Sequence, residues 1–178
     1  MESNKKKLRK KLLQILNNLS DEYVKDSSDN IFSKLIKTSE YNKAKVIFIY
    51  LSKDKEVQTK KIIEDAWSTN KIVLVPYIFE DGKMLPVQIN NFDNLKRNRY
   101  NILEPKELKI YDKNDIDLII LPCISANNKG ERLGYGGGYY DRFLEKSNSR
   151  TICLCHEKLV AEDIPMTDKD IYIDIVIY

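Results

Sequence analysis

The sequence predicts an α/β fold: a single domain spanning residues 1–178, with an open, mainly parallel sheet flanked by helices. Short β-branched and aromatic runs alternate with segments whose apolar residues recur every three or four positions. Five of the six glycines lie between Gly130 and Gly138, after an apolar run and before a helix-like segment. Ligand loops of open α/β sheets lie at such a position, at the carboxyl end of a strand.

The N-terminal quarter predicts two helices. Ser20, followed by Asp21 and Glu22, has the pattern of an N-cap with acidic residues in the first helical turn. The apolar positions of the helix before this cap are Leu8, Leu12, Ile15, Leu16 and Leu19. Those of the helix after it are Tyr23, Val24, Ile31, Phe32, Leu35 and Ile36. Both sets have the spacing of an amphipathic helix packed on a core.

The remainder predicts the strands and two more helices. The strand-like runs are residues 46–51, 72–75, 77–79, 84–89, 118–121, 152–155 and 171–177. The pair Asp81-Gly82 predicts a tight turn, and Pro86 favours an edge strand. A helix is also expected at residues 139–146. The apolar positions of the helix expected between the first two strands are Val57, Ile62, Ile63, Ala66 and Trp67.

Composition limits the class of protein. The net charge of +3 is small for 57 charged side chains, so neither nucleic acid nor a membrane surface is expected as a partner. No apolar run approaches the roughly 18 residues of a membrane span, and the N-terminus does not resemble a signal peptide. The cysteines Cys123, Cys153 and Cys155 form no Cys-x-x-Cys pair, and a reducing compartment suits them. We expect a cytoplasmic monomer.

The glycine-rich segment, residues 130–138, is the main candidate for a functional site. Glycines there permit positive φ and let backbone N–H groups approach a bulky anion, and the following helix N-terminus adds partial positive charge. The loop lacks the Gly-Lys-Ser/Thr of a Walker A motif, and Tyr139 stands at the third glycine of a dinucleotide motif. A plain glycine-rich turn is the alternative. The polar and aromatic residues around it favour a phosphate site; they are Arg132, Tyr139, Tyr140, Asp141 and Arg142.

Several motifs resemble the 5-formyltetrahydrofolate cyclo-ligase (methenyltetrahydrofolate synthetase) family. The most specific are Asp-Leu-Ile-Ile-Leu-Pro (117–122), Gly-x-Arg-Leu-Gly (130–134) and Gly-Gly-Gly-Tyr-Tyr-Asp-Arg-Phe-Leu (136–144). Weaker matches occur in the same order along the whole chain. They are Lys-x-x-Leu-Arg (5–9), Leu-Ser (51–52) with Glu56, Ile-x-Glu-Pro (102–105), and Pro165 followed by Asp170 and Asp174. The resemblance implies a three-layer α/β sheet of the kind shared with sugar-phosphate isomerases and CoA transferases.

The resemblance also implies a reaction and its ligands. The family closes 5-formyltetrahydrofolate to 5,10-methenyltetrahydrofolate with ATP and Mg²⁺, releasing ADP and phosphate, after phosphorylation of the formyl oxygen. Arg132 is the implied catalytic residue. The implied ATP-binding residues are Lys5, Arg9, Arg132, Leu133, Gly134, Tyr135, Gly136, Gly137, Gly138, Tyr139 and Tyr140. The implied folate-binding residues are Leu51, Glu56, Tyr100, Gly136, Gly137, Gly138 and Tyr139. Asp141 and Asp170 are the implied Mg²⁺ ligands, with Asp174 as the fallback.

Taken without the resemblance, several of these residues have simpler interpretations. Lys5 and Arg9 would belong to a solvated basic helix face, and Asp141 and Glu56 would be ordinary first-turn acids. Tyr100 would be a core or surface residue.

The sequence also departs from the family pattern. Asn127 replaces an aspartate, Tyr135 replaces a basic residue of the loop, Leu159 replaces a glutamine, and His156 replaces an aromatic residue as a packing substitution. These changes leave a divergent, non-catalytic binder of ATP or folate as an alternative. An isomerase-like or CoA-transferase-like enzyme that needs no ATP is another. A Ser-His-Asp hydrolase is remote, since the chain has a single histidine and no nucleophile elbow.

Overall fold

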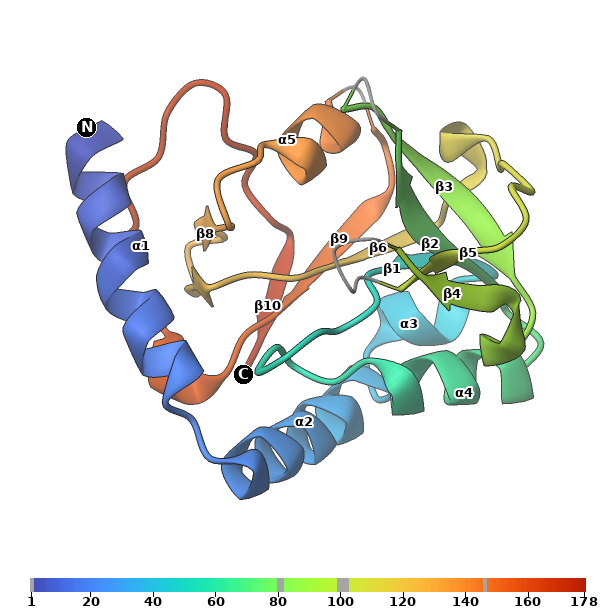
Figure 1. Ribbon diagram of the computed structural model, residues 1–178, viewed down its shortest axis with the longest axis horizontal. Helices are drawn as coiled ribbons and strands as arrows, with labels where there is room; N and C mark the ends of the chain where they lie inside the picture. Colours follow the sequence, from blue (N-terminus) through green and yellow to red (C-terminus); the bar gives the residue numbers. More distant parts are fainter. Residues whose placement is uncertain (1, 80–81, 99–102, 146) are drawn as a thin grey trace.

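The computed structural model describes residues 2–79, 82–98, 103–145 and 147–178. Its centre is a six-stranded sheet with the strand order β10-β9-β6-β1-β2-β3 (Figure 1). These strands are β1 (Val46–Ile49), β2 (Ile72–Ile78), β3 (Met84–Ile89), β6 (Leu118–Leu121), β9 (Arg150–Leu154) and β10 (Ile175–Ile177). All neighbouring pairs are parallel except β2 and β3, so the predicted mainly parallel sheet is confirmed.

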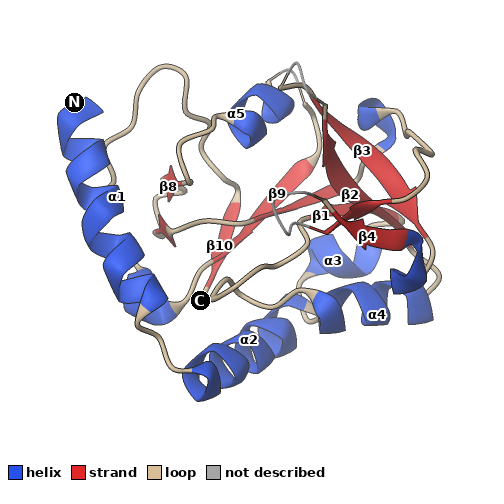
Figure 2. Ribbon diagram, in the orientation of Figure 1, coloured by secondary structure: helices blue, strands red, loops and turns tan. Residues whose placement is uncertain are grey.

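Helices cover both faces of the sheet (Figure 2). They are α1 (Glu2–Asn17), α2 (Asp21–Leu35), α3 (Ser39–Lys43), α4 (Lys60–Ser68) and α5 (Tyr139–Leu144). Alternate residues of β1 point to opposite faces. Phe48 packs in the apolar cluster that includes α1 and α5, and Ile47 packs in the cluster that includes α3, α4 and most of α2. Burial on both faces explains why the parallel strands are continuous apolar runs in the sequence.

Short elements complete the chain. They are β4 (Leu95–Arg97), β5 (Leu103–Pro105), β7 (Ser125–Ala126), β8 (Arg132–Leu133), and the 3₁₀ turns η1 (Phe92–Asn94), η2 (Lys113–Asp115) and η3 (Glu157–Leu159). The hairpins β4–β5 and β7–β8 and the helix α3 were not predicted, because two- to five-residue elements show no measurable periodicity. Among the described residues, no helix has both the length and the apolar character needed to cross a membrane.

Several predicted boundaries were wrong. The runs expected at 72–75 and 77–79 form the single strand β2, and the strand expected at 152–155 spans Arg150–Leu154. The strand expected at 46–51 ends at Ile49, and the following helix begins only at Lys60, because Ser52 and Thr59 exchange hydrogen bonds of 3.1 Å across the connecting loop. The strand expected at 171–177 is confined to Ile175–Ile177. Before it, Ile173 donates to the Gly130 carbonyl at 2.8 Å instead of joining the ladder.

Two further predicted boundaries concern α5 and the β2–β3 hairpin. The helix expected at 139–146 ends at Leu144, and the last residue expected in it lies outside the described residues. The first two residues of the turn expected at 80–83 also lie outside them, but Gly82 has φ +80°, as a tight turn requires.

Prolines mark the edge of the ladder. Pro86 lies in β3, at one end of the sheet, which confirms its predicted edge position. Pro76 lies in β2 but pairs only with Pro86, because the register of β1 against β2 stops at Phe48 and Leu74. Neither proline therefore removes a hydrogen bond from the buried part of the sheet.

The topology changes direction beside β1, and this positions the site. The chain leaves β1 through α4 on one face to reach β2, and leaves β6 through α5 on the other face to reach β9. The carboxyl ends of β1 and β6 therefore border a crevice, the usual ligand position in open α/β sheets. Residues 50–56 extend from one side of this crevice, and the glycine-rich segment extends from the other.

Candidate active site

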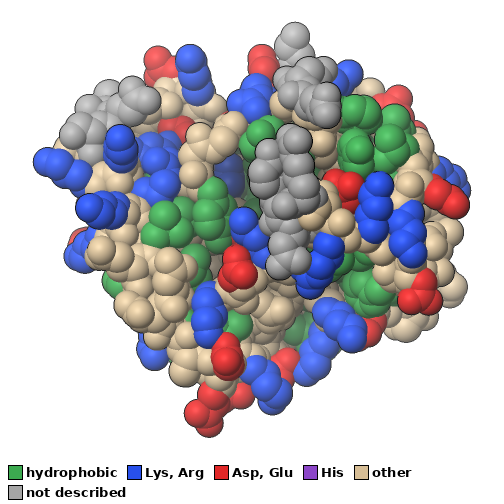
Figure 3. All heavy atoms as spheres, viewed as in Figure 1, with side chains coloured by type: hydrophobic (Ala, Val, Ile, Leu, Met, Phe, Trp, Pro, Cys, Tyr) green, Lys and Arg blue, Asp and Glu red, His purple; other side chains and the backbone are tan. Residues whose placement is uncertain are grey.

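A pocket of about 830 Å³ opens at this edge of the sheet. Its wall is formed by α1, the glycine-rich segment, the start of α5 and the segment 167–170. The residues that line it are Lys5, Lys6, Arg9, Pro122, Arg132, Gly134, Tyr135, Gly136, Gly137, Gly138, Tyr139, Tyr140, Asp141, Thr167, Asp168, Lys169 and Asp170. In the space-filling view, Lys and Arg side chains gather over α1, on the left of Figure 3. The pocket is therefore suited to a polyanion.

The glycine-rich segment has the backbone conformation that its composition predicted. Gly136 has φ +99° and Gly138 has φ +64°, both in the region that side-chain-bearing residues avoid. Gly138 is also the N-cap residue of α5, so the first N–H groups of the helix lie where the loop meets the pocket. Such exposed amides can donate to phosphate oxygens.

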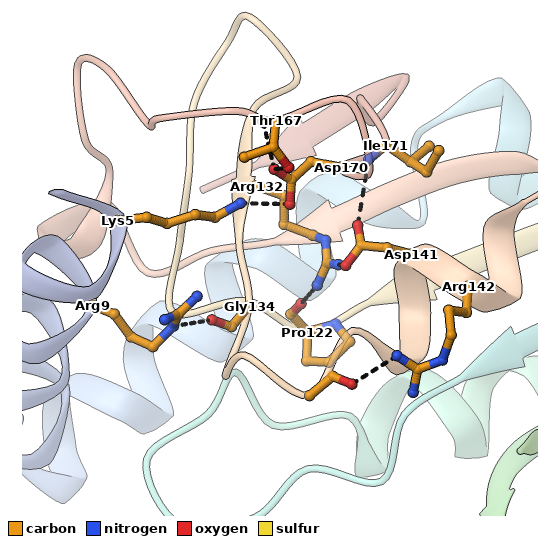
Figure 4. Close-up of polar contacts among 11 residues, drawn as sticks. Lys5, Arg9, Pro122, Arg132, Gly134, Asp141, Arg142, Thr167, Asp170 and Ile171 are labelled. Atoms are coloured by element: carbon orange, nitrogen blue, oxygen red, sulfur yellow. Dashed lines mark hydrogen bonds and ion pairs between the residues drawn. The ribbon is translucent and has the colours of Figure 1, made fainter. Parts of the chain in front are cut away.

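Arg132 is held almost completely buried beside this loop. It lies in β8, where it pairs with Ala126 of β7, and its side chain is 5% exposed. Nη1 donates to the Pro122 carbonyl at 3.2 Å, and Nη2 donates to Asp141 Oδ2 at 3.1 Å (Figure 4). Its Nε has no hydrogen-bond partner among the described residues. A buried guanidinium with an unused donor is arranged to receive another acceptor, such as a phosphate oxygen.

α1 brings two cations from the far end of the chain to the same pocket. Lys5 Nζ lies 2.5 Å from Asp170 Oδ1, and Arg9 Nε donates to the Gly134 carbonyl at 2.9 Å (Figure 4). The Lys5 side chain is 12% exposed, whereas Lys7 and Lys10 on the same helix are exposed. The solvated basic face considered for Lys5 and Arg9 is therefore wrong for these two residues.

Asp141 and Asp170 face the pocket from two different segments. Asp141 accepts from Arg132 and, through Oδ1, from the Ile171 N–H at 3.4 Å. Asp170 accepts from Lys5 and from the N–H and hydroxyl of Thr167, both at 2.7 Å. Burial alone would raise the pKa of Asp170, but its hydrogen bonds from Lys5 and Thr167 outweigh burial and lower this pKa.

Asp141 and Asp170 are also the predicted ligands of Mg²⁺. Among the described residues, no group of three or more His, Cys, Asp or Glu side chains could hold a metal ion by itself. Mg²⁺ commonly takes one or two protein carboxylates and completes its shell with water and substrate phosphates, so Asp141 and Asp170 fit that ion. Asp174, the fallback, binds Thr151 and Arg150 at the amino end of β9, on the opposite edge of the sheet.

Glu56 lies buried on the β1 side of the crevice. Its Oε2 accepts from the Lys53 N–H at 3.0 Å. Burial raises the pKa of Glu56, although the Lys53 N–H and the nearby Tyr135 hydroxyl oppose the shift. Burial and this carboxylate together raise the pKa of Tyr135 well above its ordinary value.

Three of the predicted folate-binding residues, Leu51, Glu56 and Tyr100, are not among the described residues that form the wall of this pocket. Leu51 and Glu56 are not among the residues that line the pocket described above. Tyr135 contributes to both regions, because it lines the pocket and interacts with Glu56. Tyr100, the third candidate, lies outside the described residues.

The departures from the family pattern have structural partners. Asn127 holds the β7–β8 turn, since its Nδ2 donates to Glu131 Oε2 at 2.6 Å and its Oδ1 accepts from the Lys129 N–H at 3.1 Å. Leu159 is 1% exposed and belongs to the core. His156 is also buried, as expected, but it does more than fill space, because its two ring nitrogens contact Ser27 Oγ at 2.8 Å and the Lys55 carbonyl at 3.0 Å.

Sequence reasoning did not single out the segment 167–170 as a wall of the pocket. Thr167, Asp168 and Lys169 line it together with Asp170. The Thr-Asp-Lys-Asp run, in which the last carboxylate accepts from the first residue, is the signal of a side-chain-stabilised turn. That signal predicts a turn but not what the turn faces.

Comparisons with known proteins agree along the whole chain. The family model of the 5-formyltetrahydrofolate cyclo-ligase family matches residues 1–178. A 5-formyltetrahydrofolate cyclo-ligase of Mus musculus is 32% identical over 190 residues, covering 99% of this chain and 94% of the relative. One of Haemophilus influenzae is 27% identical over 174 residues, covering 94% and 93%.

Solved structures share the fold. A 5,10-methenyltetrahydrofolate synthetase of Aquifex aeolicus superposes with a TM-score of 0.86 and 27% identity, covering 97% of this chain and 88% of that one. A 5,10-methenyltetrahydrofolate synthetase of Mycoplasma pneumoniae superposes with a TM-score of 0.79, covering 97% of each chain. At 21% identity, that second likeness concerns the fold alone.

Proposed function

The chain belongs to the 5-formyltetrahydrofolate cyclo-ligase family, and from this premise we propose that it closes 5-formyltetrahydrofolate to 5,10-methenyltetrahydrofolate at the expense of ATP. The observation that carries the proposal is the convergence of Lys5, Arg9 and Arg132 on one pocket beside the glycine-rich segment. Three cations and a row of exposed amides are what a triphosphate requires.

The chemistry needs a leaving group that the formyl oxygen does not supply. We propose that this oxygen attacks the γ-phosphorus of ATP, which releases ADP. The second folate nitrogen then attacks the formyl carbon, loses its proton, and phosphate departs as the ring closes. No covalent bond to the protein is required, so the enzyme contributes positioning and charge neutralisation.

In this proposal, the cations bind the phosphates. Arg132 offers a fixed fork of donors, including the buried Nε that has no partner among the described residues. Lys5 and Arg9 approach from α1, on the side opposite the loop. Because Arg132 and Lys5 are now paired with carboxylates, binding of ATP exchanges their partners, and each cation moves towards a phosphate oxygen.

Asp141 and Asp170 would then hold Mg²⁺, which would neutralise part of the charge of the triphosphate. In the structure each carboxylate is paired with a pocket cation, Asp141 with Arg132 and Asp170 with Lys5. Such pairing holds the two partly buried carboxylates at the pocket wall, where they could act as hard oxygen ligands.

We propose that the formyl folate lies across the crevice between β1 and β6, with Glu56 accepting hydrogen bonds from N–H donors of its pterin ring. Burial removes competing water from this carboxylate, which strengthens such bonds. Leu51 would line the same site, Tyr139 would stack on a flat ring, and Tyr100 remains a folate-binding candidate from the sequence.

An absorbance assay tests the proposal. We expect the purified protein, with 5-formyltetrahydrofolate and Mg-ATP, to form the methenyl product and to release one ADP per ring closed. Omitting ATP or Mg²⁺ should abolish the reaction. Binding of Mg-ATP and folate without turnover would identify a non-catalytic binder, and turnover without ATP would identify a different reaction class.

A further inference from the structure

A second pocket, of about 610 Å³, lies on the other side of Tyr139 from the phosphate-binding pocket. It opens between α5, the start of β3 and the segment 111–113. We call it the side pocket; its charged and aromatic lining includes Lys83, Tyr111, Lys113, Tyr139, Arg142 and Phe143. Tyr139 lines both pockets, so anything bound in one lies against the wall of the other.

Two glycines of the loop shape this wall. A Cβ at Gly137 would lie 2.7 Å from the Tyr139 ring, and a Cβ at Gly138 would lie 2.7 Å from Arg142 Nη1. Arg142 Nη1 donates to the Gly137 carbonyl at 3.0 Å (Figure 4), and its guanidinium lies 5.1 Å from the centre of the Tyr139 ring. The bare loop therefore holds an aromatic ring and a cation at the mouth of the side pocket.

The remaining lining determines what chemistry fits. Lys83, Lys113 and Arg142 are cations, and among the described lining residues Asp112 is the single carboxylate. Its Oδ1 already accepts from the N–H and the side-chain amide of Asn114, both at 2.9 Å. Aromatic rings line the same space; they are Tyr111, Tyr139 and Phe143. Flat surfaces with excess positive charge suit an aromatic ring that ends in carboxylates.

We propose that the side pocket binds the aminobenzoyl-glutamate end of the folate, with Arg142 and Lys113 recognising its carboxylates; this rests on the function proposed above. The formyl group must meet the γ-phosphate beside the glycine-rich segment. The acidic end of the folate must then extend away from the γ-phosphate, in a different direction from the rest of the nucleotide. Across Tyr139 it finds cations that the triphosphate does not occupy.

The test compares a substrate that carries the aminobenzoyl-glutamate end with one that lacks it. Arg142→Gln should raise the KM for 5-formyltetrahydrofolate about tenfold, the loss expected for one charge-assisted hydrogen bond. Arg142 also donates to the Gly137 carbonyl of the loop, so Lys113→Gln, which does not touch the loop, carries the control. Lys113→Gln should raise the folate KM two- to threefold and should leave unchanged both the KM for ATP and the turnover of 5-formyltetrahydropterin, which lacks the aminobenzoyl-glutamate. Arg150→Gln, an exposed arginine at the opposite edge, is the matched control.

Three results would overturn the assignment: equal effects of Lys113→Gln on both pterin substrates, a raised KM for ATP in Lys113→Gln, or no effect of either variant on the folate KM. Should the wild-type protein turn over no formyl folate, the proposed function fails first. The pocket is then judged by NMR alone. 4-Aminobenzoyl-glutamate should shift the ring resonances of Tyr111 and Tyr139 in wild-type protein but not in Arg142→Gln, and absence of that shift rejects the side pocket.

Discussion

The two edges of the sheet use the same residue type for different purposes. At the carboxyl edge, Asp141 and Asp170 pair with the side-chain cations Arg132 and Lys5 and line a pocket. At the amino edge, Asp117 accepts from the backbone N–H groups of Lys45 and Val46, at 2.8 and 2.9 Å. Asp174 accepts there from the Thr151 N–H and hydroxyl, at 2.8 and 2.7 Å, and also pairs with the exposed Arg150 at 3.1 Å, but it is not among the residues that line the pocket.

The two kinds of carboxylate differ in how readily each can exchange its hydrogen-bond partner. A backbone donor is fixed by the fold, so a carboxylate bonded to it stabilises the strand end and cannot change partners cheaply. A lysine or arginine head group can move, so the pair can open towards a ligand of either charge. Carboxylates bonded to mobile cations in a pocket are therefore the better candidates for function.

The largest expected effect is at the carboxyl edge. Asp141→Asn keeps the size of the side chain but removes its charge, so Mg²⁺-dependent turnover should fall by about a hundredfold or more. The variant should still fold, but its melting temperature should fall, because the buried Arg132 guanidinium loses its charged partner. Turnover and thermal unfolding, measured on one preparation, check this. Undiminished turnover would remove Asp141 from the metal site.

Glu56 sharpens the comparison, because this carboxyl-edge residue accepts from a backbone N–H. If its ionised form binds the pterin, Glu56→Gln should raise the folate KM or lower turnover, by about tenfold in kcat/KM. Since burial raises the pKa of Glu56, wild-type kcat/KM should fall as the pH drops through that raised value. The variant should lose this acidic limb. Identical pH profiles and kinetics in both proteins would return Glu56 to a structural role.

At the amino edge, the expected effect is on stability alone. Asp174→Asn should lower the free energy of unfolding by about 1–3 kcal/mol, because the Thr151 N–H loses a charged acceptor. The folded variant should keep wild-type turnover at saturating substrate. Urea unfolding followed by circular dichroism measures the first quantity. A loss of turnover with unchanged stability would contradict the contrast between the edges.

The smallest expected effect is on stability and concerns Asp170. Hydrogen bonds from Lys5 and Thr167 lower its pKa in the folded protein, so its ionisation favours folding above the ordinary value of 3.8. That contribution is lost as the pH falls through the lowered folded-state value. Asp170→Asn should therefore show a shallower loss of stability below about pH 4. Parallel acid-unfolding curves for the variant and the wild type would show that the ion pair contributes nothing.

The local features of this protein were predictable because neighbouring residues determine them. The apolar runs of β1 and β6 marked buried strands, and Ser20 was confirmed as the N-cap of α2, accepting from the Tyr23 N–H at 3.1 Å. The positive φ of Gly136 and Gly138 was likewise expected from composition. Motif resemblance, rather than spacing, supplied Arg132, Lys5 and Arg9 as site residues.

The sequence alone determined the order of the main helices and of the strands of the central sheet, the glycine conformations and the residue types available for phosphate. Only the tertiary structure decided which charges meet. Lys5 and Asp170 are 165 residues apart, and Arg9 and Gly134 are 125 apart. The side pocket likewise joins α5 to the start of β3. Such contacts depend on how helices pack across the sheet, a balance of many distant apolar contacts that no local pattern encodes.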